Sequence, residues 1–193
     1  MRGRQGASGT AATKALMAQA WTAWTQGTFE GNSEAIGLYR RLLNASPRSA
    51  DGWGLLACAY SDRAQYWTRP SEREPVRLRA RSAGQRALEL DPKNAYGRVA
   101  IAYARPFRGN WLLMEREFRR ASTDQPGKTL GTFSVAFLLG HVGRFSDAAP
   151  LLEQIRHVAP TVNQFRYHVE ALWGAGRLDE AERLLDEAMS IYA

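Results

Sequence analysis

Cysteine, lysine and long apolar runs are scarce in this chain of 193 residues. The single cysteine, Cys58, excludes an internal disulfide framework and suits a reducing compartment. No run approaches the ~20 apolar residues that a membrane-spanning helix needs. The arginines near the N-terminus are not followed by the apolar block of a secretion signal. We therefore expect a cytoplasmic protein with no membrane segment.

Residue patterns typical of catalysis or metal binding are also missing. The three histidines, His141, His157 and His168, form no H-x3-H pair and lie near no second cysteine, so no zinc site is indicated. The stretch QPGKT resembles the end of a phosphate-binding loop, but Ser122 stands where that loop requires its first glycine. Because no acid–base or nucleophile constellation is present either, we expect no enzyme activity, no cofactor and no metal.

The net charge is +7, and nearly all of the basic side chains are arginines. Such a charge permits acidic partners but does not by itself indicate nucleic-acid binding. Residues 1–13 are rich in Gly, Ser, Thr and Ala, and we expect them to form a disordered leader. The remaining residues 14–193 suffice for one domain or two small ones.

Prolines recur along the chain at a nearly constant interval. The spacing is 34 residues from Pro92 to Pro126 and from Pro126 to Pro160, and 45 residues from Pro47 to Pro92. The longer interval is the same period with an 11-residue insertion. A fixed period of this length is the signature of a helical repeat protein.

Other positions fall into register when the segments are aligned on these prolines. Trp53, Leu56, Ala57 and Tyr60 match the W-x2-L-G-x2-Y pattern of a first helix, with Ala in the Gly position. Twelve, eight and five residues before each proline are the second-helix positions, which are mostly small or apolar: Ala35, Tyr39 and Leu42; Ala80, Gly84 and Ala87; Met114, Phe118 and Ala121; Ala148, Leu152 and Ile155.

The aligned positions resemble those of the tetratricopeptide repeat (TPR) family over residues 14–193. The resemblance implies an all-α fold in which antiparallel helix pairs stack into a right-handed superhelix. About five repeats are expected, at residues 14–47, 50–92 with the insertion near 61–79, 95–126, 129–160 and 163–193. No single pair buries its apolar face alone, so neighbouring repeats must stack.

A narrower resemblance concerns the order of three stretches, at residues 24–47, 81–104 and 109–121. Their order is similar to the repeat region of bacterial multidomain transcription regulators. The chain holds no DNA-binding or cyclase domain, so neither activity is carried over. The resemblance implies an interaction or sensory module.

In the TPR family the first helix of each repeat lines a concave surface that binds proteins or peptides. Carried over position by position, the resemblance predicts a mainly aromatic groove: Trp21, Trp24, Cys58, Tyr96, Val99, Tyr103, Leu130, Phe133, Phe137, His141, Gln164 and Tyr167. This set lacks a clustered Lys/Arg clamp, so an apolar or aromatic segment of a protein or peptide partner is favoured. A small-molecule effector that closes the groove is an alternative.

The insertion adds a second candidate surface, which is rich in arginine: Arg69, Arg73, Arg77, Arg79 and Arg81. We interpret it as an irregular turn whose arginines pair with Glu72 and Glu74 in water. The alternatives are a docking site for an acidic or phosphorylated partner and nonspecific nucleic-acid contact.

The last helical pattern, residues 176–193, ends at a repeat boundary. Its apolar residues recur at helical spacing, and part of this stripe would face a missing neighbour: Leu184, Leu185, Ala188, Ile191 and Tyr192. We expect either a longer protein or a homodimer formed through this helix.

Overall fold

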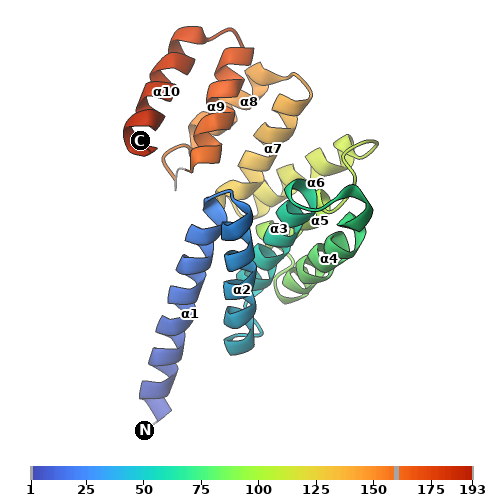
Figure 1. Ribbon diagram of the computed structural model, residues 1–193, viewed down its shortest axis with the longest axis vertical. Helices are drawn as coiled ribbons and strands as arrows, with labels where there is room; N and C mark the ends of the chain where they lie inside the picture. Colours follow the sequence, from blue (N-terminus) through green and yellow to red (C-terminus); the bar gives the residue numbers. More distant parts are fainter. Residues whose placement is uncertain (1, 159–160, 193) are drawn as a thin grey trace. The chain divides into compact units, whose positions relative to one another are not determined.

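The computed structural model describes residues 2–158 and 161–192, and the side chains of residues 11–158 and 161–191. Within that part of the chain the regular structure is entirely helical (Figure 1). The elements are α1 (Arg2–Thr25), α2 (Phe29–Ala45), α3 (Ala50–Tyr66), the 3-10 turn η1 (Pro70–Glu72), α4 (Arg73–Leu90), α5 (Ala95–Tyr103), α6 (Trp111–Asp124), α7 (Thr129–His141), α8 (Phe145–Ile155), α9 (Val162–Gly174) and α10 (Leu178–Tyr192).

The helices form two compact units, unit 1 at residues 1–107 and unit 2 at residues 108–193. In unit 1, α1 packs on α2, α2 on α3, and α3 on both α4 and α5. In unit 2, α6 packs on α7, α7 on α8, α8 on α9, and α9 on α10. Within each unit, each helix therefore packs on the next along the chain, and the predicted all-α repeat architecture is confirmed. The boundary falls between α5 and α6, the two helices that we assign to the third repeat.

The turns between the two helices of a repeat depend on glycine in four of the five repeats. Gly27, Gly109, Gly143 and Gly176 all have φ between 67° and 80°. An L side chain rarely adopts this left-handed conformation, which ends one helix and allows a tight reversal. The turn between α3 and α4 contains no such glycine.

The insertion is taken up mainly by helices rather than by an irregular loop. α3 and α4 are 17 and 18 residues long, whereas α7 and α8 are 13 and 11. The short turn that remains is held by the Thr68 hydroxyl, which donates to the Arg63 carbonyl at 2.7 Å. Helical extension satisfies the backbone hydrogen bonds that a long loop would leave to water.

The core lies at the second-helix positions that the alignment of the repeats predicts. All twelve aligned positions from Ala35 to Ile155 are buried, with Tyr39 and Phe118 the largest of the fully enclosed side chains. Small residues bring the helices of unit 1 close together. A Cβ on Gly97 would lie 2.9 Å from the Ala87 Cβ, and one on Gly84 would lie 3.0 Å from the Gly97 carbonyl oxygen.

The N-terminal leader differs from the expectation. The backbone of residues 2–13 continues α1, where the sequence predicts disorder. Once the packed part of α1 is formed, each added residue gains a hydrogen bond without a new nucleation cost. The alanines of this segment favour such an extension, and its glycines oppose it.

Candidate functional site

The predicted groove residues gather at two places, one in each unit. In unit 2 they form a continuous group on α7 and α9, the first helices of two consecutive repeats. We call Phe133, Phe137, His141 and Tyr167 the α7–α9 aromatic cluster. The ring centroids of Phe133 and Tyr167 lie 5.6 Å apart, and those of Phe137 and Tyr167 lie 5.1 Å apart; both pairs are edge-to-face. Such pairs contribute about 0.5–1.5 kcal/mol each beyond the area they bury.

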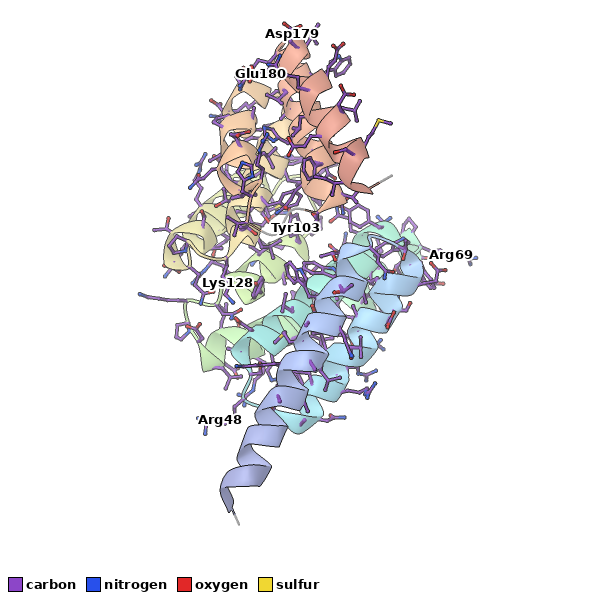
Figure 2. The ribbon with its side chains drawn as sticks, turned by 90° about the vertical axis from the view of Figure 1, so that its left-hand side faces the viewer. Arg48, Arg69, Tyr103, Lys128, Asp179 and Glu180 are labelled. Carbon is purple, nitrogen blue, oxygen red and sulfur yellow. The ribbon has the colours of Figure 1, made fainter. Side chains whose placement is uncertain are left out.

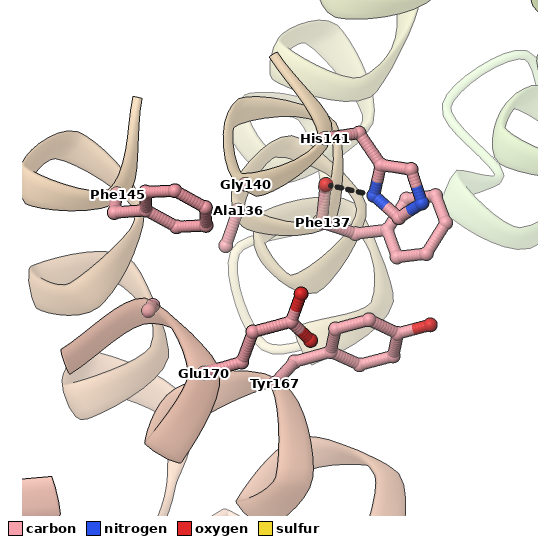
Figure 3. Close-up of a pocket in the computed structure, with 8 residues that line it drawn as sticks. Ala136, Phe137, Gly140, His141, Phe145, Tyr167 and Glu170 are labelled. Atoms are coloured by element: carbon pink, nitrogen blue, oxygen red, sulfur yellow. Dashed lines mark hydrogen bonds between the residues drawn. The ribbon is translucent and has the colours of Figure 1, made fainter. Parts of the chain in front are cut away.

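His141 completes the cluster at its rim. Its ring centroid lies 4.1 Å from that of Phe137, and its Nδ1 is 2.9 Å from the Phe137 carbonyl oxygen (Figure 3). His141 is exposed overall. The Arg166 guanidinium carbon lies 4.1 Å from the Tyr167 ring centroid, which is a cation–π contact.

The members of the cluster differ in exposure. Phe137 is buried, whereas Phe133 and Tyr167 are half-buried and reachable from solvent. Leu130, one turn before Phe133, is also half-buried. Gln164 has a different role, because its side-chain oxygen accepts from the Thr161 N–H at 3.1 Å and completes a capping box at the start of α9. It belongs to the helix cap rather than to the surface for a ligand.

A small pocket opens beside these rings. Its empty volume is about 230 Å³ with its mouth included, and its lining comes from three helices: Ala136, Phe137, Gly140, His141, Phe145, Tyr167, Glu170 and Ala171. Figure 3 shows the Glu170 carboxylate beside Tyr167, with Phe145 entering from α8. Neither Glu170 nor Phe145 was predicted from the sequence. Glu170 lies one helical turn after Arg166 and could have been found from the i+4 spacing.

In unit 1 several predicted groove residues belong to the core instead. Val99 is 1% exposed, Cys58 4% and Tyr96 9%. The Cys58 thiol donates to the Tyr96 carbonyl at 3.4 Å, and burial raises its pKa well above the usual value. A thiol in this setting is a packing group rather than a nucleophile. Tyr103 remains half-buried, with its ring centroid 6.1 Å from that of Phe107 (Figure 2 labels Tyr103).

The two predicted tryptophans of unit 1 meet a carboxylate that was not predicted from the sequence. Trp21 and Trp24 are half-buried and edge-to-face, with ring centroids 5.3 Å apart. The indole N–H of Trp24 donates to Asp62 Oδ2 at 2.7 Å and so ties α1 to α3. Burial raises the pKa of Asp62 to about 7, although the Trp24 hydrogen bond acts in the opposite direction. We call Trp21, Trp24 and Asp62 the tryptophan–aspartate site.

The arginines of the insertion do not gather into one free surface. Arg73 donates to the Thr68 carbonyl at 3.0 Å, and Arg77 lies 4.0 Å from Glu74. Arg81 pairs with Glu74 and donates to the Ala104 carbonyl at 3.2 Å. Arg69 and Arg79 are exposed, and Arg69 projects from the turn after α3 (Figure 2). The pairing with Glu74 agrees with the expected ion pairs in water, but Arg73, Arg77, Arg79 and Arg81 lie on α4 and not in an irregular turn.

The apolar stripe of α10 is split between core and surface. Leu184 is 3% exposed, whereas Leu185 and Ile191 are 47% and 53% exposed; Ala188 is half-buried. The side chain of Tyr192 lies outside the described residues. Asp179 and Glu180 sit together at the start of α10 (Figure 2), where carboxylates interact favourably with the helix dipole.

Metal sites and membrane spans gain no support from the described residues. No group of three or more His, Cys, Asp or Glu side chains within residues 2–158 and 161–192 is placed to hold a metal ion. In the same part of the chain, every helix is too short or too polar to cross a membrane.

No family model matches the sequence, and no curated protein sequence matches it. Solved structures do match. A thermophilic TPR protein from Thermus thermophilus is 16% identical and has a TM-score of 0.64, covering 92% of this chain and 90% of its own. A TPR protein from Parabacteroides merdae is 16% identical, with a TM-score of 0.60, over 98% of this chain and 75% of its own. YrrB, described as a TPR protein with an unusual peptide-binding site, is 15% identical with a TM-score of 0.50, over 83% of this chain and 78% of its own. The chain therefore has the tetratricopeptide repeat fold.

Proposed function

We propose that this protein is a binding scaffold that takes an apolar or aromatic side chain of a protein or peptide partner on the α7–α9 aromatic cluster. The observation that carries the proposal is the half-buried pair Phe133 and Tyr167, backed by the buried ring of Phe137. A buried ring behind two accessible ones is a rigid anchor surface, which binds without much loss of side-chain freedom.

The hollow beside the cluster is shallow. Its volume of about 230 Å³ includes open solvent, so the hollow does not enclose a small molecule as a drug-sized pocket does. A small-molecule effector is therefore the weaker alternative. Peptide recognition is also what the description of YrrB reports for that protein, which shares the fold.

The basic insertion is the weaker alternative for an acidic or nucleic-acid partner. Arg73, Arg77 and Arg81 are engaged within unit 1, which leaves the exposed Arg69 and Arg79 as the better donors to a partner. Each such exposed charge contributes mainly salt-dependent attraction.

Two further expectations stay within the proposal. The similarity to the repeat region of bacterial regulators suggests an interaction module of such a regulator, acting in the cytoplasm.

The exposed side chains Leu185, Met189 and Ile191 suggest self-association through α10. Light scattering tests this self-association: the wild type should be a dimer, and the Leu185→Glu variant should be a monomer. A monomeric wild type at high concentration would exclude it.

The binding proposal is tested with a peptide selected on the wild-type protein from a random display library, followed by calorimetric titration. Phe133→Ala should weaken binding at least tenfold and leave the far-ultraviolet circular dichroism unchanged. Trp173→Ala is the matched control, because it also removes a ring from unit 2 but its side chain is 69% exposed and does not line the pocket. Equal affinities of Phe133→Ala and the wild type, or no selectable peptide, would contradict the proposal.

A further inference from the structure

Among the described residues, the carboxylate of Asp62 has no cationic partner. The hydrogen bond to its side chain comes from the Trp24 indole, which occupies Oδ2. The adjacent basic residue, Arg63, is directed elsewhere. Its Nε donates to Asn32 Oδ1 at 2.9 Å, and its guanidinium carbon lies 4.1 Å from the Phe29 ring centroid. Oδ1 of Asp62 is therefore available to a ligand.

An uncompensated carboxylate in this position is costly. Burial weakens its hydration, and one indole hydrogen bond does not replace the charge of a partner. The pKa of Asp62, raised to about 7, has the same origin. A neutral polar residue at this point of α3 could accept the same hydrogen bond from Trp24 without this cost, so the negative charge of Asp62 is a candidate for a role in binding.

The neighbouring rings offer a second element of recognition. Trp21 and Trp24 meet at 72°, and the Tyr96 ring centroid lies 6.5 Å from that of Trp21. Both indoles are half-buried, so part of each ring is accessible. Indole faces attract cations and also pack against the aliphatic stems of long basic side chains.

We propose that the tryptophan–aspartate site binds a lysine or arginine side chain of a protein partner, with the charged head on Asp62 Oδ1 and the aliphatic stem on the Trp21 and Trp24 rings. The site lies within unit 1 and shares no residue with the α7–α9 aromatic cluster. This proposal can therefore be confirmed or contradicted independently of the function proposed above. The net charge of +7 repels cations in general, so nonspecific attraction would not produce such binding.

The probe is a pair of short blocked peptides, Gly-Lys-Gly and Gly-norleucine-Gly, which differ only in the aminomethyl end of the side chain. Binding is followed by the indole ¹H–¹⁵N resonance of Trp24, assigned with Trp24→Phe. The lysine peptide should shift this resonance saturably, and the norleucine peptide should bind at least tenfold more weakly. This comparison uses only the wild-type protein.

Asp62→Asn keeps an oxygen for the Trp24 indole but removes the charge. It should weaken the binding of the lysine peptide at least tenfold. Glu34→Gln is the matched control, since Glu34 is an exposed carboxylate on α2 with the same charge change; its affinity should equal that of the wild type. Equal binding of the two peptides, unchanged affinity in Asp62→Asn, or no saturable shift at millimolar peptide would each overturn the proposal.

Discussion

Units 1 and 2 use aromatic side chains on the first helices of their repeats for different chemistry. In unit 1, Trp24 turns its N–H to the carboxylate of Asp62, which joins α1 to α3. In unit 2, Phe133, Phe137 and Tyr167 pack on one another and leave their charged neighbours exposed. The repeat specifies where a side chain points, but the residue at each position decides whether the surface is apolar or holds a half-buried charge.

The largest expected loss of stability comes from removing a core ring of one unit. Phe118 is completely buried on α6, so Phe118→Ala should reduce the free energy of unfolding by about 3–5 kcal/mol. Leu112→Ala, on the same helix but 84% exposed, should change it by less than about 0.5 kcal/mol. Urea denaturation measures both. Similar losses in the two variants would show that α6 is packed differently.

The second test concerns Asp62, the half-buried carboxylate of unit 1. Because folding raises the pKa of Asp62 from 3.8 to about 7, the folded state holds this proton more tightly than the unfolded state. The contribution of Asp62 to stability therefore falls as pH rises from about 4 to about 7, and is constant above. Asp62→Asn should be more stable than the wild type at pH 8 by up to about 4 kcal/mol, at about 1.4 kcal/mol per pKa unit.

At pH 4 the same substitution should have little effect, because both side chains are then neutral in the folded state. Thermal unfolding at the two pH values measures the difference. An equal effect at pH 4 and pH 8 would mean that Asp62 titrates normally in the folded protein.

Unit 2 should show the opposite pH dependence, with a smaller amplitude. His168 is 3% exposed, and burial lowers its pKa from 6.5, with Glu153 at 3.6 Å opposing the shift in part. The unfolded state then binds the proton more tightly, so stability from this group is lost as pH falls below about 6.5. His168→Gln should flatten the decline in the protection of α9 amides below this pH, measured by hydrogen exchange. An unchanged slope would exclude His168 as its source.

The smallest expected change in stability comes from Tyr39 in unit 1, where the buried hydroxyl can be removed while the packed ring is kept. The Tyr39 hydroxyl is buried with no hydrogen-bond partner among the described residues, and burial raises its pKa. Tyr39→Phe keeps the ring and removes an unsatisfied group, so it should stabilise the protein by roughly 1 kcal/mol. Chemical denaturation at neutral pH measures this. A loss of stability would indicate that a buried water satisfies the hydroxyl.

Repeat-level features were predictable from the sequence because they follow from local pattern. The terminating prolines Pro47, Pro92 and Pro126, the turn glycines Gly143 and Gly176, and the buried second-helix positions all depend on spacing within one helix pair. Pro160 lies outside the described residues. The α7–α9 aromatic cluster was predicted for the same reason, since Phe133, Phe137 and Tyr167 occupy first-helix positions of adjacent repeats.

What the sequence did not reveal depends on contacts between helices. Asp62 acquires its role from Trp24, which is 38 residues away. Val99 and Cys58 occupy inner positions, but the close approach of α3 and α5 buries them. Gln164 looked like a groove residue and instead caps α9. The composition of residues 1–13 predicted a disordered leader, because composition alone does not show that α1 extends into this segment from its packed part.

The central claim is that a partner side chain contacts the α7–α9 aromatic cluster, and site-specific photo-crosslinking tests it most directly. A benzophenone amino acid placed at Leu130, beside the cluster, or at Trp173, away from it, is irradiated with the selected peptide. The account predicts a crosslinked product from position 130 and none from position 173, with competition by unlabelled peptide. Crosslinking of equal yield at both positions, or at position 173 alone, would contradict it.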